Sequence, residues 1–409
     1  MSLRETLANL FWKLGLGTLR KNLRGQTAVR YLKKNITAIR GEGPIRIAFI
    51  VYEPAMWDKQ EPVYLEALSR SDMEPYLIVV PDITGTQELA QQKQAFFMEK
   101  YDHVLLYDEN TVRLFEKKHF HYTFYQTPYS FKYPAPLQPY KLVKHTKICF
   151  VPYGYIGSGD FFEITSNRAF FDNVYFGFMD SEPMAELLHG KYEKNCASGL
   201  QHFDFWGYPP FEYYLNLKKE KGDIQNVLWI PRWSYAEKGG GSHFLEHKDL
   251  FNDLAKNNPQ MNWTMRPHPL MFPTLARQGL FSEEDAAAYR KALAEANVYL
   301  DENSLLNDTL CNTDLMIADF SSIIIMYFLT GRPIIYCEGG LELSGVYLQL
   351  QEGMYIAHSW EDVLRYTEDL KNGIDPLKEK RLEIIAAEEK KHYGASKRIV
   401  DTIQQDYHC

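Results

Sequence analysis

The chain has 409 residues, of which 45% are hydrophobic and 24% are charged, as in a globular protein long enough for two domains. Its five cysteines are scattered, with no C-x-x-C pair and no histidine at metal spacing, which excludes a disulfide framework and a structural zinc site. The sequence has no apolar run of about 18 residues and no secretory signal, so we expect a cytoplasmic protein without a transmembrane segment.

The net charge of -8 is unevenly distributed. Residues 1–40 carry nine Lys/Arg and one acid, whereas the rest of the chain carries 36 basic and 52 acidic residues. Large apolar residues recur near helical spacing in this basic segment: Leu3, Leu7, Leu10, Phe11, Leu14, Leu16 and Leu19, with Trp12 beside them. This combination predicts an amphipathic helix on an anionic membrane surface. The alternative is a helix that packs on the protein. Nucleic acid is disfavoured, because the acidic remainder would repel it.

After a linker at Gly41–Pro44, short apolar runs alternate with helical stretches. Runs of this kind are typical of buried parallel strands, and the alternation predicts helices on both faces of the sheet. Residues 45–217 are therefore expected to form a Rossmann-like domain. Its expected helices include Glu61–Arg70 and Thr86–Lys100, and its expected strands are Ile45–Tyr52, Tyr76–Val80, His103–Tyr107, His121–Tyr125, Lys147–Val151, Asn173–Phe176 and Phe203–Trp206.

A charged stretch, Leu217–Asp223, precedes a second alternating series. Residues 223–395 are expected to form a second Rossmann-like domain. Residues 396–409 are expected to form a C-terminal helix, and one possible place for this helix is on the first domain. Two such domains are the architecture of GT-B transferases and related epimerases, whose site lies outside the carboxyl ends of the strands. The expected strands are Val227–Ile230, Asn262–Met265, Asp314–Ala318 and Pro333–Tyr336, and the expected helices lie near Phe244–Lys256, Ser282–Ala296, Trp360–Lys371, Pro376–Lys391 and Ala395–Gln405, with a further one from Ser321.

Two polar segments directly follow predicted strands of the second domain. Arg232 stands on a turn stiffened by Pro231, where its guanidinium can reach phosphate oxygens or simply cap the rim of the sheet. His268 lies between two prolines in the run Arg266–Pro269, which fix its backbone. A rigidly presented imidazole can hydrogen-bond a phosphate or give a proton to a leaving group, although a lone loop histidine is more often structural or exposed.

A third segment follows the strand that ends before Asp319. Ser321 and Ser322 then open an apolar helix, and the serine hydroxyls together with free backbone N–H groups can hold a diphosphate. Serine caps without any ligand are the commoner outcome of this pattern. The functional reading therefore depends on the three segments sharing one face of the domain.

In four places and in the same order, the sequence resembles the CDP-glycerol glycerophosphotransferases of teichoic-acid and capsule synthesis. The resemblance covers roughly residues 225–405. Pro231–Trp233 resembles a P-T-W-R-like turn of the family, and Arg266–Pro269 resembles its K-P-H-P loop. Asp319–Ser322 with Arg332–Ile334 resembles its D-Y-S-S element followed by R-P-I. Tyr393–Ile399 resembles its D-G-x-A-S-x-R-I element.

The resemblance implies a donor site and a reaction. His268 and the Ser321/Ser322 helix start would bind the diphosphate of a CDP-linked donor, beside Arg266 and Asp319, with Arg232 or Arg398 assisting. An acceptor hydroxyl would attack the distal phosphorus and CMP would leave, with catalysis by positioning and charge stabilisation. No metal and no cofactor are expected, and the acceptor would be a membrane-linked glycan or polyol phosphate at the inner face of the cell membrane.

The first domain departs from this family. Members carry a W-H-G-T motif there, whose histidine is a candidate base, whereas this chain has Tyr153 followed by Gly154 on the acceptor side. Tyrosine titrates near 10 and is a poor base at neutral pH. Asp160 or Glu163 is the replacement that the sequence offers.

Two other functions stay open at this point. A GT-B glycosyltransferase that uses a nucleotide sugar would share the fold and the phosphate contacts, but it would form a glycosidic bond. A binding or scaffold protein that kept the fold and lost its base is the second alternative, because of Tyr153. The sequence indicates no oligomeric state.

Overall fold

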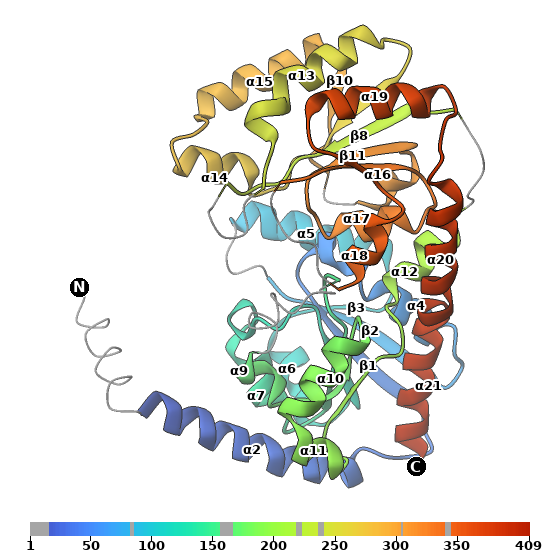
Figure 1. Ribbon diagram of the computed structural model, residues 1–409. Helices are drawn as coiled ribbons and strands as arrows, with labels where there is room; N and C mark the ends of the chain where they lie inside the picture. Colours follow the sequence, from blue (N-terminus) through green and yellow to red (C-terminus); the bar gives the residue numbers. More distant parts are fainter. Residues whose placement is uncertain are drawn as a thin grey trace. The chain divides into compact units, whose positions relative to one another are not determined.

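The computed structural model describes residues 16–81, 86–155, 167–217, 223–235, 241–303, 306–339 and 345–409. It divides the chain into two compact units, each with one parallel sheet and flanking helices (Figure 1). Unit 1 comprises Met1–Pro210 and Gly394–Cys409, and unit 2 comprises Phe211–Tyr393. The prediction of two Rossmann-like α/β domains is confirmed.

The sheet of unit 1 has the strand order β3-β2-β1-β4-β5-β6-β7. All its pairings are parallel, with Ile45 opposite Met73 and Ile47 opposite Tyr122. Every strand expected from the apolar runs is present, and the central strands β1, β4, β5 and β6 are almost fully buried. The strands are β1 Ile45–Val51, β2 Met73–Val79, β3 Val104–Leu106, β4 Tyr122–Tyr125, β5 Lys147–Phe150, β6 Val174–Phe178 and β7 His202–Asp204.

The helices of unit 1 connect these strands, and the C-terminal helix α21 joins them. Lys147, at the start of β5, has a fully buried side chain, and its Nζ lies 2.6 Å from Oδ2 of Asp406 on α21. The helices are α2 Leu16–Ala38, α3 Pro54–Trp57, α4 Glu61–Leu68, α5 Gln87–Lys100, α6 Glu109–Glu116, α7 Pro139–Leu142, α9 Arg168–Phe171, α10 Glu182–Lys191, α11 Glu193–Ala197 and α21 Ala395–His408, with 3₁₀ turns η1 Ser130–Lys132 and η2 Ala135–Leu137.

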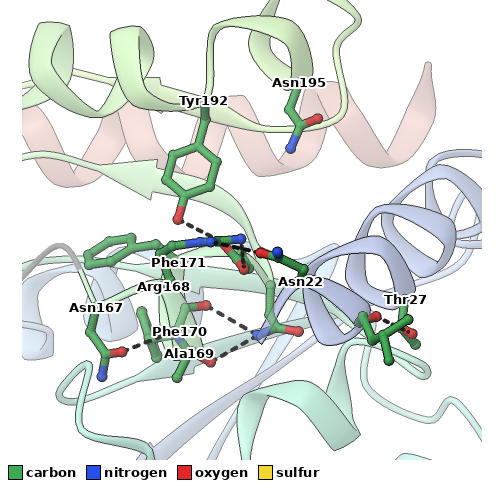
Figure 2. A network of polar contacts seen from close by, with 12 residues as sticks. Asn22, Thr27, Asn167, Arg168, Ala169, Phe170, Phe171, Tyr192 and Asn195 are labelled. Atoms are coloured by element: carbon green, nitrogen blue, oxygen red, sulfur yellow. Dashed lines mark hydrogen bonds and ion pairs between the residues drawn. The ribbon is translucent and has the colours of Figure 1, made fainter. Parts of the chain in front are cut away.

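Helix α2 packs on unit 1 through one face, on which Ala28, Leu32 and Asn35 are buried, and Ile39, directly after the helix, is buried as well. Near its N-terminal end, Nη1 of Arg168 lies 3.3 Å from Oδ1 of Asn22 (Figure 2). For residues 22–39 the structure therefore shows packing on the protein, with the basic side chains outside this face. The apolar residues from Leu3 to Leu14 lie outside the described residues, and nothing is described of the side chains of Leu16 and Leu19.

The sheet of unit 2 has the order β10-β9-β8-β11-β12-β13, again parallel throughout. The strands are β8 Asn226–Ile230, β9 Asn262–Met265, β10 Val298–Leu300, β11 Leu315–Ala318, β12 Ile334–Cys337 and β13 Tyr355–Ala357. The sequence analysis missed β10 and β13, which have three residues each and form the two edges of the sheet, where the pattern is too short to stand out.

The helices of unit 2 enclose an aromatic core on the sheet, in which Trp229, Phe244 and Phe251 are fully buried. The order of the strands reverses between β8 and β11, and the crevice outside the carboxyl ends at such a reversal is where α/β sheets bind ligands. The helices are α12 Pro210–Leu215, which begins one residue before the unit, α13 Phe244–Asn257, α14 Met271–Arg277, α15 Glu283–Glu295, α16 Asn307–Cys311, α17 Ile323–Phe328, α18 Val346–Gln351, α19 Trp360–Lys371 and α20 Lys378–His392. Among the helices built from described residues, none is long and apolar enough to cross a membrane.

Candidate donor site at the strand ends of unit 2

The three segments predicted to carry chemistry follow the neighbouring strands β9, β8 and β11, so they meet at the carboxyl ends of these strands. The rings of Trp233 and His268 lie 5.8 Å apart between centroids, which joins the β8 and β9 segments. Nη1 of Arg232 donates to the carbonyl of Phe320 at 2.9 Å, which joins the β8 and β11 segments. Arg232 therefore stands between the imidazole and the serine-headed helix.

Asp319, directly after β11, connects the segments at these strand ends through its side chain. Its carboxylate is fully buried, and Oδ2 accepts hydrogen bonds from the backbone N–H of Arg232 at 2.8 Å and of His243 at 3.0 Å. Its other oxygen, Oδ1, lies 2.7 Å from Nδ1 of His243. In this structure Asp319 thus holds the β8 segment and the start of α13 together.

His243 is a residue that the sequence analysis missed. It follows Gly241-Ser242 and directly precedes α13, and no strand ends beside it in the sequence to draw attention to it. The hydrogen bond to Asp319 raises the pKa of His243, in spite of partial burial. Its ring stacks on His247 at 4.9 Å, and burial together with the charge of His243 lowers the pKa of His247. Of the two histidines, His243 is therefore the one that takes up a proton more readily.

His268 is presented outward by its loop. Its Nδ1 accepts a hydrogen bond from the backbone N–H of Leu270 at 3.1 Å. Partial desolvation of the ring and the positive charge of Arg232 lower the pKa of His268, so its imidazole is neutral at pH 7. Because Nδ1 is the acceptor in this neutral ring, the proton resides on Nε2. Nε2–H is a donor suited to a phosphate oxygen, and in this tautomer it cannot take up a further proton as a base.

The two serines at the start of α17 differ in their hydrogen bonds. Oγ of Ser321 accepts a hydrogen bond from the backbone N–H of Ile323, the first residue of the helix, at 3.3 Å. Ser322 is exposed, and its side chain makes no capping hydrogen bond. Beside them, the buried hydroxyl of Tyr336 has no hydrogen-bond partner among the described residues, and it lies near enough to feel the charges of Arg232 and Asp319.

Arg266 is engaged with the protein itself. Its guanidinium lies 2.5 Å from Oδ2 of Asp301 and donates to the carbonyl of Asn303 at 2.8 Å. Together with His268 it lines a cavity of about 530 Å³. The remaining wall comes from the loop after β9, from α14 and α15, and from the segment after β10. Its apolar members are Pro267, Pro269, Phe272, Pro273, Ala276, Ala286 and Ala287, and its polar members are Ser282, Glu283, Arg290, Asp301, Glu302 and Asn303.

The other predicted site residues belong to unit 1. The hydroxyl of Tyr153 lies 2.7 Å from that of Tyr129, and burial raises the pKa of Tyr153 well above its usual range. Gly154 faces open space. Nε of Arg398, on α21, donates to the carbonyl of Trp206 at 2.8 Å. Asp160 and Glu163 lie outside the described residues, and no group of His, Cys, Asp or Glu within the described ranges is arranged to hold a metal ion.

Comparison with known proteins connects this site to a family. Residues 212–403 match the family described as CDP-glycerol:poly(glycerophosphate) glycerophosphotransferase. Among solved structures, the wall teichoic acid polymerase TagF is similar with a TM-score of 0.52 and 13% identity, over 100% of this chain and 98% of that chain. A UDP-GlcNAc 2-epimerase from Neisseria meningitidis bound to UDP-GlcNAc has a TM-score of 0.54 and 12% identity, over 88% and 100% of the two chains. We found no match among curated proteins.

Two parallel α/β units with these strand orders, and a polar edge at the strand reversal of the second unit, define a protein of the GT-B class. The solved structures share this fold. Residues 212–403 match the CDP-glycerol glycerophosphotransferase family, as the four sequence motifs predicted, and the members of this family are transferase enzymes.

Proposed function

We propose that the enzyme moves a glycerol-phosphate-like group from a CDP-linked donor to a hydroxyl of a membrane-linked glycan or polyol-phosphate acceptor. CMP is the second product, and the polymer is a teichoic acid or a capsule. The observation that carries the proposal is the placement of Arg232 between His268 and the Phe320–Ser322 segment, in the domain that matches the glycerophosphotransferase family. Such a cluster suits a diphosphate, because Arg232 supplies a positive charge while His268 and Ser322 supply an N–H and an O–H donor.

In this proposal the diphosphate lies beside Arg232. It accepts one hydrogen bond from Nε2–H of His268 and another from the hydroxyl of Ser322. The nucleoside enters the cavity of about 530 Å³, where Pro267 and Phe272 supply apolar walls. Arg266 serves to shape that cavity, since its guanidinium is already paired with Asp301. No metal and no further cofactor are required in this scheme.

The acceptor oxygen forms a bond to the distal phosphorus, while the bond from that phosphorus to the bridging oxygen breaks. CMP leaves with the electron pair, and Arg232 and His268 stabilise the charge that develops on its phosphate. The proton of the acceptor hydroxyl passes to a base. Tyr153 is unsuited to this role, because its raised pKa keeps the phenol neutral. Asp160 and Glu163 stay the predicted candidates.

Polymer synthesis of this kind needs the enzyme at the inner face of the cell membrane. The basic residues 1–40 support this location, although residues 22–39 use their apolar face for packing on unit 1. In this proposal residues 1–15 carry the apolar contribution to membrane binding and the exposed cations of α2 add attraction to anionic lipid. The acceptor would be reached on the same surface.

The donor is identified by the nucleotide that is released. The full chain is incubated with a membrane fraction as acceptor and with CDP-glycerol, CDP-ribitol or UDP-GlcNAc in turn, and the released nucleotide is quantified. We expect CMP from a CDP-polyol, and we expect H268A to reduce its rate on the order of 100-fold or more. Release of UDP alone would establish the glycosyltransferase alternative. No turnover of any donor, or an H268A rate within a few-fold of the parent, would refute the phosphate site.

A further inference from the structure

Unit 1 contains a hollow of about 370 Å³ to which the proposed transfer reaction assigns no role. Its walls come from α6, η2, α7 and the segment that follows α7. The buried side chains of Phe115 and Leu142 form its floor, whereas Glu116, Ala135, Pro136 and Lys141 are exposed. The lining residues are Val112, Phe115, Glu116, Ala135, Pro136, Lys141, Leu142, Lys144 and His145.

The hollow is positively charged. Lys141 and Lys144 line it directly, and the ring of His145 feels the negative charge of Glu116 and the positive charges of Lys144, Lys118 and Lys34. Within the described part of the chain, no ion pair engages any of these four lysines. Glu116 is the one acid among the lining residues. Two lysines and one glutamate therefore line the hollow, and two further lysines lie near enough to act on His145, which favours an anionic ligand.

The cations are brought together by packing contacts. Asn35 is fully buried, and its Nδ2 donates to the carbonyls of Val143 at 2.7 Å and Thr146 at 3.2 Å. These bonds fix α2 against the segment after α7 and so place Lys34 near His145. Nζ of Lys144 lies 5.7 Å from the ring centroid of Tyr31, also on α2.

Lys118 follows the end of α6 with a φ of 56°. This left-handed conformation closes helices and favours glycine or asparagine. The backbone N–H of the next residue, His119, donates to the carbonyl of Leu114 at 3.0 Å, which completes the helix end. A lysine therefore occupies a position where a side chain is disfavoured, and its charge acts on His145.

We propose that this hollow binds an organic phosphate of the glycerol-phosphate type. Lysine ammonium groups bind phosphate oxygens as point charges, and the apolar floor of Phe115 and Leu142 accommodates the carbon part of the ester. The same chemical group occurs in a soluble polyol phosphate and in the headgroup of phosphatidylglycerol. The site does not depend on the transfer reaction, so binding can be measured without donor and without turnover.

Binding to the full chain is measured in two arms: calorimetric titration with sn-glycerol 3-phosphate, and cosedimentation with phosphatidylcholine vesicles with and without phosphatidylglycerol. The variant K141Q/K144Q removes the two lining lysines. K194Q/K390Q, which removes two exposed lysines elsewhere, is the matched control. E116Q tests the opposite sign, because it removes the repelling charge. Thermal melting checks that each variant is folded.

We expect K141Q/K144Q to weaken binding on the order of tenfold or more, E116Q to strengthen it a few-fold, and the control to leave it unchanged. An effect on the soluble ester identifies a small-molecule site, and an effect confined to phosphatidylglycerol vesicles identifies a headgroup site. Equal losses for K141Q/K144Q and K194Q/K390Q, no binding in either arm, or no gain for E116Q would overturn the proposal.

Discussion

Asp319 joins two segments of unit 2 through His243. Oδ1 of Asp319 lies 2.7 Å from Nδ1 of His243, while Oδ2 accepts the backbone N–H groups of both His243 and Arg232. One buried carboxylate thus determines where the β8 segment and the start of α13 lie, and through Arg232 it determines the geometry of the candidate donor site.

Replacement of Asp319 by asparagine should therefore damage both stability and activity. The NH₂ group of asparagine would face one of the N–H groups that now donate to the carboxylate, and that hydrogen bond would be lost. We therefore expect the free energy of unfolding of unit 2 to fall by about 2–4 kcal/mol. Urea unfolding of D319N measures this loss, and D253N, at an exposed acid on α13, is the control. Equal unfolding midpoints for the two variants would contradict the role assigned to Asp319.

The raised pKa of His243 predicts a pH dependence of stability. A histidine whose pKa is higher in the folded state stabilises the fold fully below the unfolded value of about 6.5, and this contribution is lost as the pH rises through the folded value. His247 and His268 have lowered pKa values and act in the opposite sense, so the difference between the parent and H243Q is the informative quantity. This difference should shrink from pH 6 to pH 9, as measured by urea unfolding. A difference that grows with pH would show that His243 is not the histidine of the pair that takes up a proton more readily.

His268 should act as a hydrogen-bond donor through Nε2. Glutamine can donate from its side-chain amide, whereas alanine cannot, so H268Q should retain more activity than H268A. We expect a gap on the order of 10-fold in kcat/KM for the CDP-linked donor, because one oriented donor to a phosphate is restored in part. If both variants were equally inactive at every pH, a proton transfer by the imidazole would be the better explanation.

Tyr153 should be dispensable as a base. Its phenol is neutral because burial raises its pKa, and its hydroxyl contacts Tyr129. Y153F is therefore expected to keep kcat within a few-fold of the parent and to leave the pH–rate profile unshifted. Y129F, which removes the other hydroxyl of the pair, is the control. A loss in Y153F alone of the rise in rate with increasing pH would assign the base to Tyr153.

The pairing of Lys147 with Asp406 should stabilise unit 1. D406N leaves the buried ammonium of Lys147 without its counter-charge, and such a loss typically costs about 3–5 kcal/mol. D401N, on the same helix, breaks pairs with Arg70 and Lys397 that are partly exposed, and it should cost less than about 1 kcal/mol. Thermal unfolding of the two variants measures the contrast. Equal shifts in melting temperature would show that α21 is not anchored through Asp406.

Much of the fold could be predicted because buried parallel strands appear as continuous apolar runs. Ile45–Val51 and Leu315–Ala318 are examples, and each is buried as expected. The edge strand β10 could not be predicted in this way, because Tyr299 at its centre is exposed and its three residues show no continuous apolar run. The amphipathic pattern of residues 1–40 was equally ambiguous, since the same apolar face can pack on a bilayer or on a domain.

The sequence by itself determined the alternation of strands and helices, the three polar segments at strand ends and the family, because each depends on residues that are neighbours along the chain. Only the tertiary structure decided the partners. It paired Arg266 with Asp301, placed His243 on Asp319, and brought Asp406 to Lys147 across 259 positions. Such contacts follow from the order of strands in a sheet and from the packing of helices on it, and a local pattern contains no information about either.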